Sequence, residues 1–417
     1  MNSSYLPVVR RGGPLDAAAF IPSSTLPDVM DYRPGPGLLL TAAFLGPGTL
    51  ATATLAGSSL GYDLLWTIPL AVGLAFVVQE LAARLGLATG RPLARVIAER
   101  GPGSSGTARW LAYASVGAVV LGAGAFQAGN LAGASLGLTV LTEGPSWLWS
   151  IAVADVAFLL LWFSRYEGLE AVLGSLVAVM AAAFAVQLGL LGIDGQALVA
   201  GLVPSVDAGS IGLVLALVGT TVVPYNLFLH GSALAADDEH GEGRLSAMRT
   251  DLGVSLVLGG LITASVLVAA ASTIKGARVT NAADMALALR PLLGRLAEVT
   301  IGLGLAAAGL TSAVTAPLAA AWAVDQLRGR DAERPSRAVW APVLLIGTGV
   351  AVLPLEPVGL IVTAQIANAL VLPLLVGACL WVANRVDADE GGNGWLANAA
   401  GWAAFLVTVG LAAGLLV

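Results

Sequence analysis

Two stretches of the sequence decide the fold: FLGPGT at residues 44–49 and TVVPYN at residues 221–226. Each places a proline within an apolar run long enough to cross a bilayer. Proline removes a backbone N–H and clashes with the preceding turn, so each run should break and leave amide and carbonyl groups unpaired. Inside a membrane, such groups are tolerated only where they line a protein cavity. The pair therefore predicts two broken helices around a substrate site; two proline-kinked packing helices are the alternative.

The composition indicates an all-α membrane protein. Of the 417 residues, 57% are hydrophobic and only 11% are charged, a balance that soluble globular proteins do not show. About 20 apolar residues cross the hydrocarbon core of a bilayer. On that criterion the sequence contains eleven spans, at residues 36–58, 62–83, 110–140, 147–164, 168–192, 208–235, 251–273, 297–324, 338–355, 358–384 and 396–417.

The two interrupted spans occupy matching places, as the first and the sixth. Interruptions at corresponding positions of two five-helix halves are typical of an inverted repeat with its substrate site near the membrane midplane. We therefore predict a first repeat over residues 36–192, a second repeat over residues 208–384 and an eleventh helix at residues 396–417. Residues 1–35 are predicted to form a cytoplasmic N-terminal tail.

The distribution of basic residues predicts the orientation. Five arginines lie within residues 84–109 and four within residues 328–337, the loops after spans two and eight. The loops on the opposite side of the membrane are nearly free of basic residues, except residues 275–295. By the positive-inside rule, the N-terminus is cytoplasmic and the C-terminus lies outside, in a bacterial-type inner (plasma) membrane.

Enzyme and nucleic-acid functions find no basis in the sequence. No Ser/His/Asp set, metal cluster or phosphate-binding loop is visible, and no basic patch with interleaved aromatic residues is present. Cys379 is the only cysteine, so an intrachain disulfide is impossible. We predict a non-enzyme without a cofactor whose partners are the lipid bilayer and a small inorganic ion. The oligomeric state stays open, and a monomer is compatible with the sequence.

Several motifs in order resemble the Nramp family of metal transporters. GPG at residues 35–37 and GPGT at residues 46–49 are similar to the family's opening, where Gly-Pro-Gly leads into an Asp-Pro-Gly-Asn motif. GTTVVPYNL at residues 219–227, followed by LH at residues 229–230, resembles its sixth-helix motif, which contains Met-Pro-His and ends in Leu-His. The resemblance covers nearly the whole chain and implies a leucine-transporter-like fold, with a 5+5 inverted repeat and broken helices 1 and 6.

The residues that the resemblance assigns to metal binding are replaced. In the family, the first-helix Asp and Asn and the sixth-helix Met coordinate a transition metal. Here Gly46 stands for the Asp, Thr49 for the Asn, Val223 for the Met, and Tyr225 for the His after the proline. A carboxylate supplies the charge and a thioether the soft ligand that select such metals. Without these two groups, the sequence gives no basis for selecting a transition metal.

What remains at the predicted site is neutral and polar. In the third helix, amides occupy positions where family members carry acidic residues linked to proton movement. The predicted substrate-binding residues are Gly46, Pro47, Gly48, Thr49, Val223, Tyr225, Asn226, Gln127, Asn130 and Gln365. Each half helix that starts at a break carries roughly half a positive charge at its N-terminus. Unless a carboxylate such as Asp155 or Glu80 reaches the chamber, that field favours an anion.

Adjacent hydroxyls in span eight suggest a sodium site. The Thr-Ser pair at residues 311–312 resembles the pair that binds Na⁺ in sodium-coupled members of the wider superfamily. The alternative is that these hydroxyls bond to carbonyls of their own helix, which is frequent in membrane helices. The predicted sodium ligands are Ala43, Gly46, Ala308, Thr311 and Ser312.

Three functions therefore stay open. The first is Na⁺-coupled symport of a small anion such as bicarbonate, with its site at the breaks of helices 1 and 6. The alternative is a divalent metal cation transporter, for Mg²⁺ or Mn²⁺, as the resemblance implies. A non-transporting receptor ranks third. Asp155, in the middle of the fourth span, is expected to bond between helices as a scaffold residue, because an ionised group is costly in a membrane.

Overall fold

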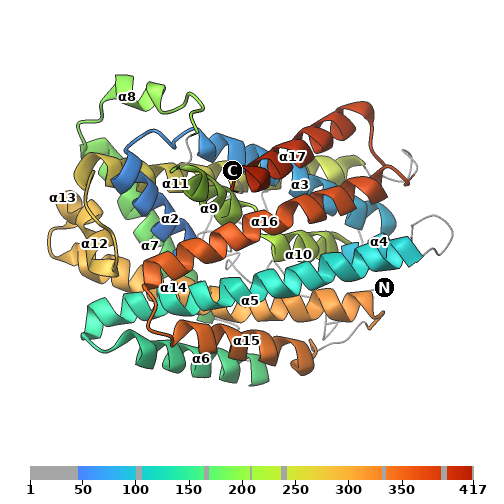
Figure 1. The fold of residues 1–417 in the computed structure, drawn as a ribbon, viewed down its shortest axis with the longest axis horizontal. Coiled ribbons are helices and arrows are strands. Elements are labelled where there is room, and N and C mark those ends of the chain that lie inside the picture. Colours follow the sequence, from blue (N-terminus) through green and yellow to red (C-terminus); the bar gives the residue numbers. More distant parts are fainter. Residues whose placement is uncertain are drawn as a thin grey trace, which may run out of the picture.

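The described part of the chain is entirely helical. The computed structural model describes residues 46–99, 106–163, 169–206, 209–235, 242–330, 335–386 and 392–415. The predicted tail at residues 1–35, the GPG motif at residues 35–37 and Ala43 lie outside these ranges. Figure 1 shows the helices stacked side by side, with α5, α14 and α16 running along the long axis of the molecule. The main helices are α2 (Pro47–Leu60), α3 (Thr67–Thr89), α4 (Leu93–Glu99), α5 (Gly106–Thr142), α6 (Ser146–Phe163), α7 (Leu169–Leu190), α9 (Ile211–Thr221), α10 (Pro224–Ala235), α11 (Glu242–Thr273), α14 (Leu296–Leu327), α15 (Arg337–Ala351), α16 (Pro357–Ala383) and α17 (Trp395–Gly414).

Shorter helices connect these elements. They are α8 (Gly195–Ala200), α12 (Ala282–Ala286), η3 (Leu287–Leu289) and α13 (Arg290–Leu293). Within the described ranges, nine helical segments are long and apolar enough to cross a membrane, with α9 and α10 together forming one of them. The two remaining predicted spans correspond to α2, which is described only from Pro47 onward, and to α15, which has 15 residues. Every predicted span thus coincides with a helix, and the all-helical fold class is confirmed.

The predicted break of the sixth span is visible at its proline, and the described part of the first span begins at its own proline. The helix α9 ends at Thr221, and α10 begins at Pro224 after Val222 leaves helical geometry with φ −98° and ψ 78°. The helix α2 begins at Pro47 behind an extended Gly46, with φ −79° and ψ −178°. Proline suits the first helical position because its missing N–H would have no helical partner there. Both α2 and α10 therefore start with a proline inside a predicted span, whereas the part of the first span before Gly46 lies outside the described residues.

Glycines bring the long helices into close contact. A Cβ atom at Gly309 of α14 would lie 2.6 Å from the Asn130 carbonyl oxygen of α5. A Cβ atom at Gly57 of α2 would lie 3.0 Å from the Ala270 side chain of α11. Membrane helices associate through such small residues, because lipid offers no hydrophobic driving force between them. The two broken helices are thereby held among α5, α11, α14 and α16.

An ion-pair network around the buried Glu80 and Arg84 links α3 to neighbouring segments. The Glu80 carboxylate of α3 accepts hydrogen bonds from Arg84 Nε at 3.1 Å and from Arg249 Nη2 of α11 at 2.6 Å. Arg84 also donates to the Gly392 carbonyl at 2.9 Å and to Asn393 Oδ1 at 2.6 Å, just before α17. The charge of Glu80 is therefore matched at this end of α3.

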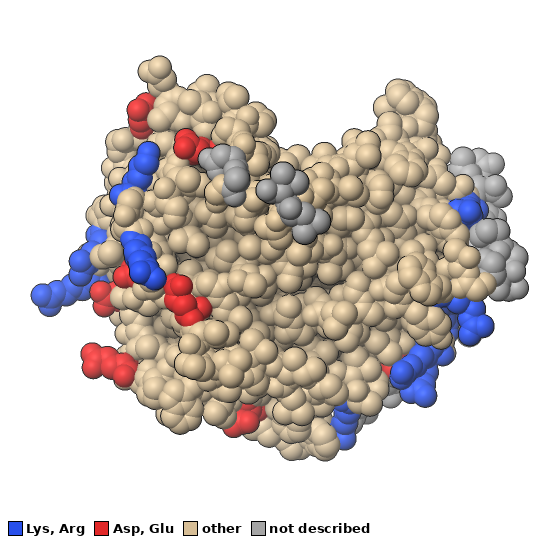
Figure 2. All heavy atoms as spheres, in the orientation of Figure 1, with Lys and Arg blue, Asp and Glu red and all other residues tan. Residues whose placement is uncertain are grey.

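Most charged side chains lie at the two ends of the molecule, and Asp155 in the middle of α6 is an exception. Figure 2 shows an almost uncharged middle, with Lys and Arg gathered at the end where α4 and α14 terminate, and a mixture of both signs at the opposite end. This arrangement is typical of a membrane-spanning protein. The orientation given by the positive-inside rule stays a prediction.

Asp155 does not have the predicted role. It lies on the exposed face of α6 beside the exposed Val156, and the described residues offer it no hydrogen bond or ion pair. The expected bond between helices is therefore not found. Because α6 presents this residue outward, the carboxylate does not enter the bundle.

We predict that Gly219→Val disrupts the packing of α9 on α16. A Cβ atom at Gly219 would overlap the Gln365 carbonyl oxygen and lie 3.0 Å from the Ala369 nitrogen, so the rigid backbone of α16 must shift. Overpacking of this kind costs about 1–3 kcal/mol. The melting temperature of the purified protein in detergent should fall, whereas Gly349→Val on α15, where nothing lies within 4 Å, should leave it unchanged. Equal melting temperatures for both variants would contradict this packing.

Candidate transport site

The two broken helices meet through a pair of threonines. The hydroxyl oxygens of Thr49 in α2 and Thr220 in α9 lie 2.9 Å apart and are hydrogen-bonded, although 171 positions separate the residues. Both side chains are buried, with 3% and 2% exposure. The first turn of α2 after its break is therefore fixed directly to the last turn of α9 before its own break. The start of α2 and the end of α9 therefore lie next to each other in the structure.

Gln365 of α16 contacts both broken helices. A Cβ atom at Gly48 would overlap the Gln365 side-chain amide, and one at Gly219 would overlap the Gln365 carbonyl oxygen. The Gln365 amide nitrogen makes only a long hydrogen bond of 3.4 Å, to the Ile361 carbonyl. Its amide oxygen is buried and has no hydrogen-bond partner among the described residues. Gln365 thus brings an unsatisfied acceptor to the start of α2.

The helix α5 packs against the break of α2 from another side. A Cβ atom at Gly133 would overlap the Pro47 ring, so the missing side chain lets proline sit against α5. Asn130 lies one turn earlier on α5, with 1% exposure. Its amide nitrogen has no hydrogen-bond partner in the described part of the structure. Asn130 therefore adds an unpaired donor on the helix that supports Pro47.

The break residue Val223 and the first turn of α10 carry three of the predicted residues. Val223, Tyr225 and Asn226 are buried, with 0%, 1% and 1% exposure. The Tyr225 ring packs edge-on against Phe126 of α5 at 5.7 Å. The Tyr225 hydroxyl and both polar atoms of the Asn226 amide find no partner among the described residues. A buried polar group without a partner costs about 1–3 kcal/mol, so this group indicates bound water or a ligand.

Gln127 lies on a different face of α5. Its amide donates to the Ala313 carbonyl of α14 at 3.0 Å, and its stem lies where a Cβ atom at Gly347 of α15 would be placed. Gln127 precedes Gly133 by six positions, which is about 120° around a helix. These contacts direct Gln127 toward α14 and α15 rather than toward Pro47. Its role in substrate binding stays a prediction.

The predicted sodium ligands are only partly accounted for. The Thr311 hydroxyl donates to the Ala307 carbonyl of its own helix at 2.9 Å, which is the alternative that the sequence left open. Ser312 and Ala308 are buried, with 4% exposure each, and Ser312 makes no hydrogen bond to a described residue. Ala43 lies outside the described ranges. The sodium site therefore stays a prediction. Within it, Ser312 carries the hydroxyl that could bind the ion.

Sequence reasoning missed Asn368. It follows Gln365 by one turn of α16, is fully buried, and has no partner for either amide atom in the described ranges. Its Oδ1 would lie 3.3 Å from a Cβ atom at Gly122 of α5. The sequence did contain a signal for Asn368, because two amide side chains spaced three residues apart within an apolar membrane span indicate a helix face that points into the protein.

The site as a whole is uncharged. Within the described residues, no group of three or more His, Cys, Asp or Glu side chains could hold a metal ion. Glu80 is paired with two arginines, and Asp155 is exposed on α6. The residues that meet at the breaks offer hydroxyls, amides and the N-termini of α2 and α10.

We predict that Thr49 and Thr220 are energetically coupled. Removing either hydroxyl with Thr49→Val or Thr220→Val eliminates their hydrogen bond, which contributes about 0.5–1.5 kcal/mol. The double variant should therefore be less destabilised than the sum of the single variants. Denaturation midpoints of the four proteins in mixed micelles measure this coupling. Strict additivity would show that the two hydroxyls do not interact.

Comparison with known proteins identifies the family. The family model described as "Natural resistance-associated macrophage protein-like" (Nramp) matches residues 37–417. The divalent metal cation transporter MntH of Xanthomonas campestris is 32% identical over 408 residues, covering 90% of this chain and 88% of that protein. MntH of Deinococcus radiodurans is 34% identical over 296 residues, covering 68% of this chain and 66% of that protein.

Solved structures share the arrangement of the helices. The Eremococcus coleocola manganese transporter in complex with an aromatic bis-isothiourea substituted compound matches with a TM-score of 0.74 and 21% identity, covering 91% of this chain and 84% of that chain. MhsT in complex with L-phenylalanine matches with a TM-score of 0.59 and 14% identity, covering 92% and 99%. At these identities the likeness concerns the fold alone, and it confirms the predicted leucine-transporter-like fold. The chain therefore belongs to the Nramp family of multi-pass membrane transporters.

Proposed function

We propose that this protein is a secondary active transporter that binds a small inorganic ion where the breaks of α2 and α9–α10 meet Gln365. The observation that carries the proposal is the set of buried, unpaired polar atoms on the elements that meet there: the amides of Asn226, Gln365 and Asn130 and the Tyr225 hydroxyl. A permeating ion would supply the missing partners. Because these relatives from Xanthomonas campestris and Deinococcus radiodurans are bacterial proteins, we place the protein in a bacterial-type inner membrane.

A divalent metal cation is the first candidate substrate. The relatives from Xanthomonas campestris and Deinococcus radiodurans are divalent metal cation transporters, and this supports the metal more strongly than the comparisons support Na⁺ with bicarbonate. The site restricts how a metal could bind, because only neutral oxygens are offered. Mg²⁺ keeps several waters and needs few protein ligands. We therefore infer a partly hydrated Mg²⁺ or Mn²⁺ ion, bound through amide and hydroxyl oxygens.

Na⁺-coupled symport of a small anion such as bicarbonate is the second candidate. One specific observation favours it: the side chains that meet at the two breaks carry no negative charge. The N-terminus of each half helix has a partial positive charge and free N–H groups, which attract anions when no carboxylate opposes them. Ser312 would help to bind the coupling ion.

The substrate can be assigned with purified protein in proteoliposomes. We expect uptake of Mg²⁺ or Mn²⁺ that does not require Na⁺, with millimolar affinity because no carboxylate offsets the cost of dehydration. Isothermal calorimetry with Mg²⁺, Mn²⁺ and Cd²⁺ gives the affinities independently. No response to any of the three at millimolar concentration, together with Na⁺-dependent uptake of bicarbonate, would replace the first candidate by the second. Absence of transport for both classes would contradict the proposal that the protein is a transporter.

Asn226→Ala tests the position of the site. Loss of a polar ligand from a buried site costs about 1–3 kcal/mol, so substrate affinity should fall roughly tenfold or more. Asn384→Ala, at an exposed asparagine that ends α16, is the matched control and should transport normally. Equal affinities for the two variants would place the substrate elsewhere.

For the second candidate, the two hydroxyls of α14 should differ. Ser312→Ala should weaken the Na⁺ dependence of uptake, whereas Thr311→Ala should weaken it less, because the Thr311 hydroxyl is already bonded to Ala307. Titration of uptake with Na⁺ measures the difference. An unchanged sodium response in both variants would remove the proposed sodium site.

A further inference from the structure

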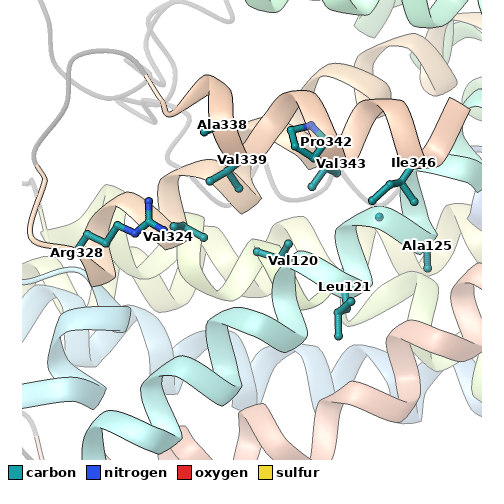
Figure 3. Close-up of a pocket in the computed structure, with 11 residues that line it drawn as sticks. Val120, Leu121, Ala125, Val324, Arg328, Ala338, Val339, Pro342, Val343 and Ile346 are labelled. Carbon is teal, nitrogen blue, oxygen red and sulfur yellow. The ribbon is translucent and has the colours of Figure 1, made fainter.

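A hollow outside the transport site opens between three helices. Its volume is about 350 Å³, and it lies between α5, α14 and α15 (Figure 3). The walls are apolar and include Val120, Leu121, Gly124, Val324, Val343 and Ile346. Leu121 is 76% exposed and Ile346 is 61% exposed, so the hollow faces the outside of the bundle. In a membrane-spanning protein, this surface meets lipid.

Gly124 lines the hollow without a side chain to fill it. A Cβ atom at Gly124 would meet nothing within 4 Å, although the residue lies on the wall between α5 and α15. Pro342 lines the opposite side and interrupts the hydrogen-bond ladder within α15. Two of the residues that line the hollow thus have small or rigid side chains.

One end of the hollow is basic. Arg328 ends α14 one turn after Val324, is exposed and lines the hollow, as Figure 3 shows. Arg337 starts α15 beside the wall residue Ala338 and stacks over the Trp162 ring at 3.8 Å. The nearest described acid on α14, Asp325, is buried and accepts the backbone N–H of Ser336 at 2.7 Å. This basic end is the one that the positive-inside rule assigns to the cytoplasm.

The dimensions fit one leaflet of a bilayer. The wall on α15 runs from Ala338 to Ile346, which is about 12 Å at the helical rise of 1.5 Å per residue. The hydrocarbon core is about 30 Å thick, so the hollow extends from the basic end to less than half of that depth. Its occupant must therefore combine an apolar chain with an anionic group at the interface.

We propose that the hollow between α5, α14 and α15 is a binding site for an anionic phospholipid of the cytoplasmic leaflet. An acyl chain lies along the wall from Ala338 to Ile346, and the phosphate of the headgroup pairs with Arg328. Basic pockets between membrane helices on the cytoplasmic side bind anionic headgroups for the same electrostatic reason. The site is separate from the helix breaks, so it does not depend on the identity of the transported ion.

Native mass spectrometry of the full-length protein in detergent, titrated with phosphatidylglycerol or phosphatidylcholine, tests the proposal. The wild type should retain more phosphatidylglycerol than phosphatidylcholine. Arg328→Gln should lower the preference for phosphatidylglycerol about fivefold, which corresponds to the ~1 kcal/mol that a basic residue contributes near an anionic surface. Arg385→Gln, at the end of α16 and away from the hollow, is the matched control and should keep the preference.

A second pair of variants tests the hollow itself. Gly124→Phe should fill it and reduce the binding of both lipids, whereas Gly349→Phe, on an exposed part of α15 with open space around it, should bind them as the wild type does. Unchanged melting temperatures establish that both proteins are folded. Full retention of phosphatidylglycerol by Arg328→Gln and Gly124→Phe would overturn the proposal. A loss of dimers in Gly124→Phe with unchanged lipid binding would assign the hollow to a second copy of the chain and overturn it as well.

Discussion

The fold depends on the requirement that every backbone polar group inside a bilayer finds a partner within the protein or in what the protein binds. The hydrogen-bond ladder of the sixth span stops at Thr221 and restarts at Pro224, and α2 begins at Pro47. These interruptions are tolerated because other helices surround them at close range. Gly133 and Gly219 have no side chains to hold the neighbouring backbones apart. The close packing and the polar site are therefore two results of the same constraint.

Most of the fold could be predicted from the sequence, because length and hydropathy determine a membrane span. The observed ends of some helices differ from the predicted ends of the spans. The second span was predicted to end before Arg84, yet α3 continues to Thr89 because Glu80 compensates the arginine within the helix. Gly90 then ends it with a left-handed φ of 60°. The ninth span was predicted to reach residue 355, whereas α15 ends at Ala351.

The candidate site was only partly predictable. The prolines could be located because proline acts locally, and Gln365 was assigned to the site through the resemblance to the Nramp family. The face that a residue presents depends on how helices rotate against each other, which one sequence does not determine. Gln127 bonds to α14, and Thr311 bonds to its own helix. Asp155 was expected inside because a membrane charge is costly, yet it lies on the outer face of α6.

The network around Arg84 has a consequence for movement. Glu80 joins α3 to α11 through Arg249, and Arg84 joins α3 to the segment before α17. Alternating access in transporters of this kind rocks one group of helices against another around a fixed site. A movement that separates α3 from α11 would break the two hydrogen bonds from Arg249 to Glu80, whereas Arg84, on the same helix as Glu80, would stay paired with the carboxylate. Because the Arg249 side chain is 45% exposed, water can replace Glu80 as its partner, so this contact between α3 and α11 opposes their separation by only a small free energy.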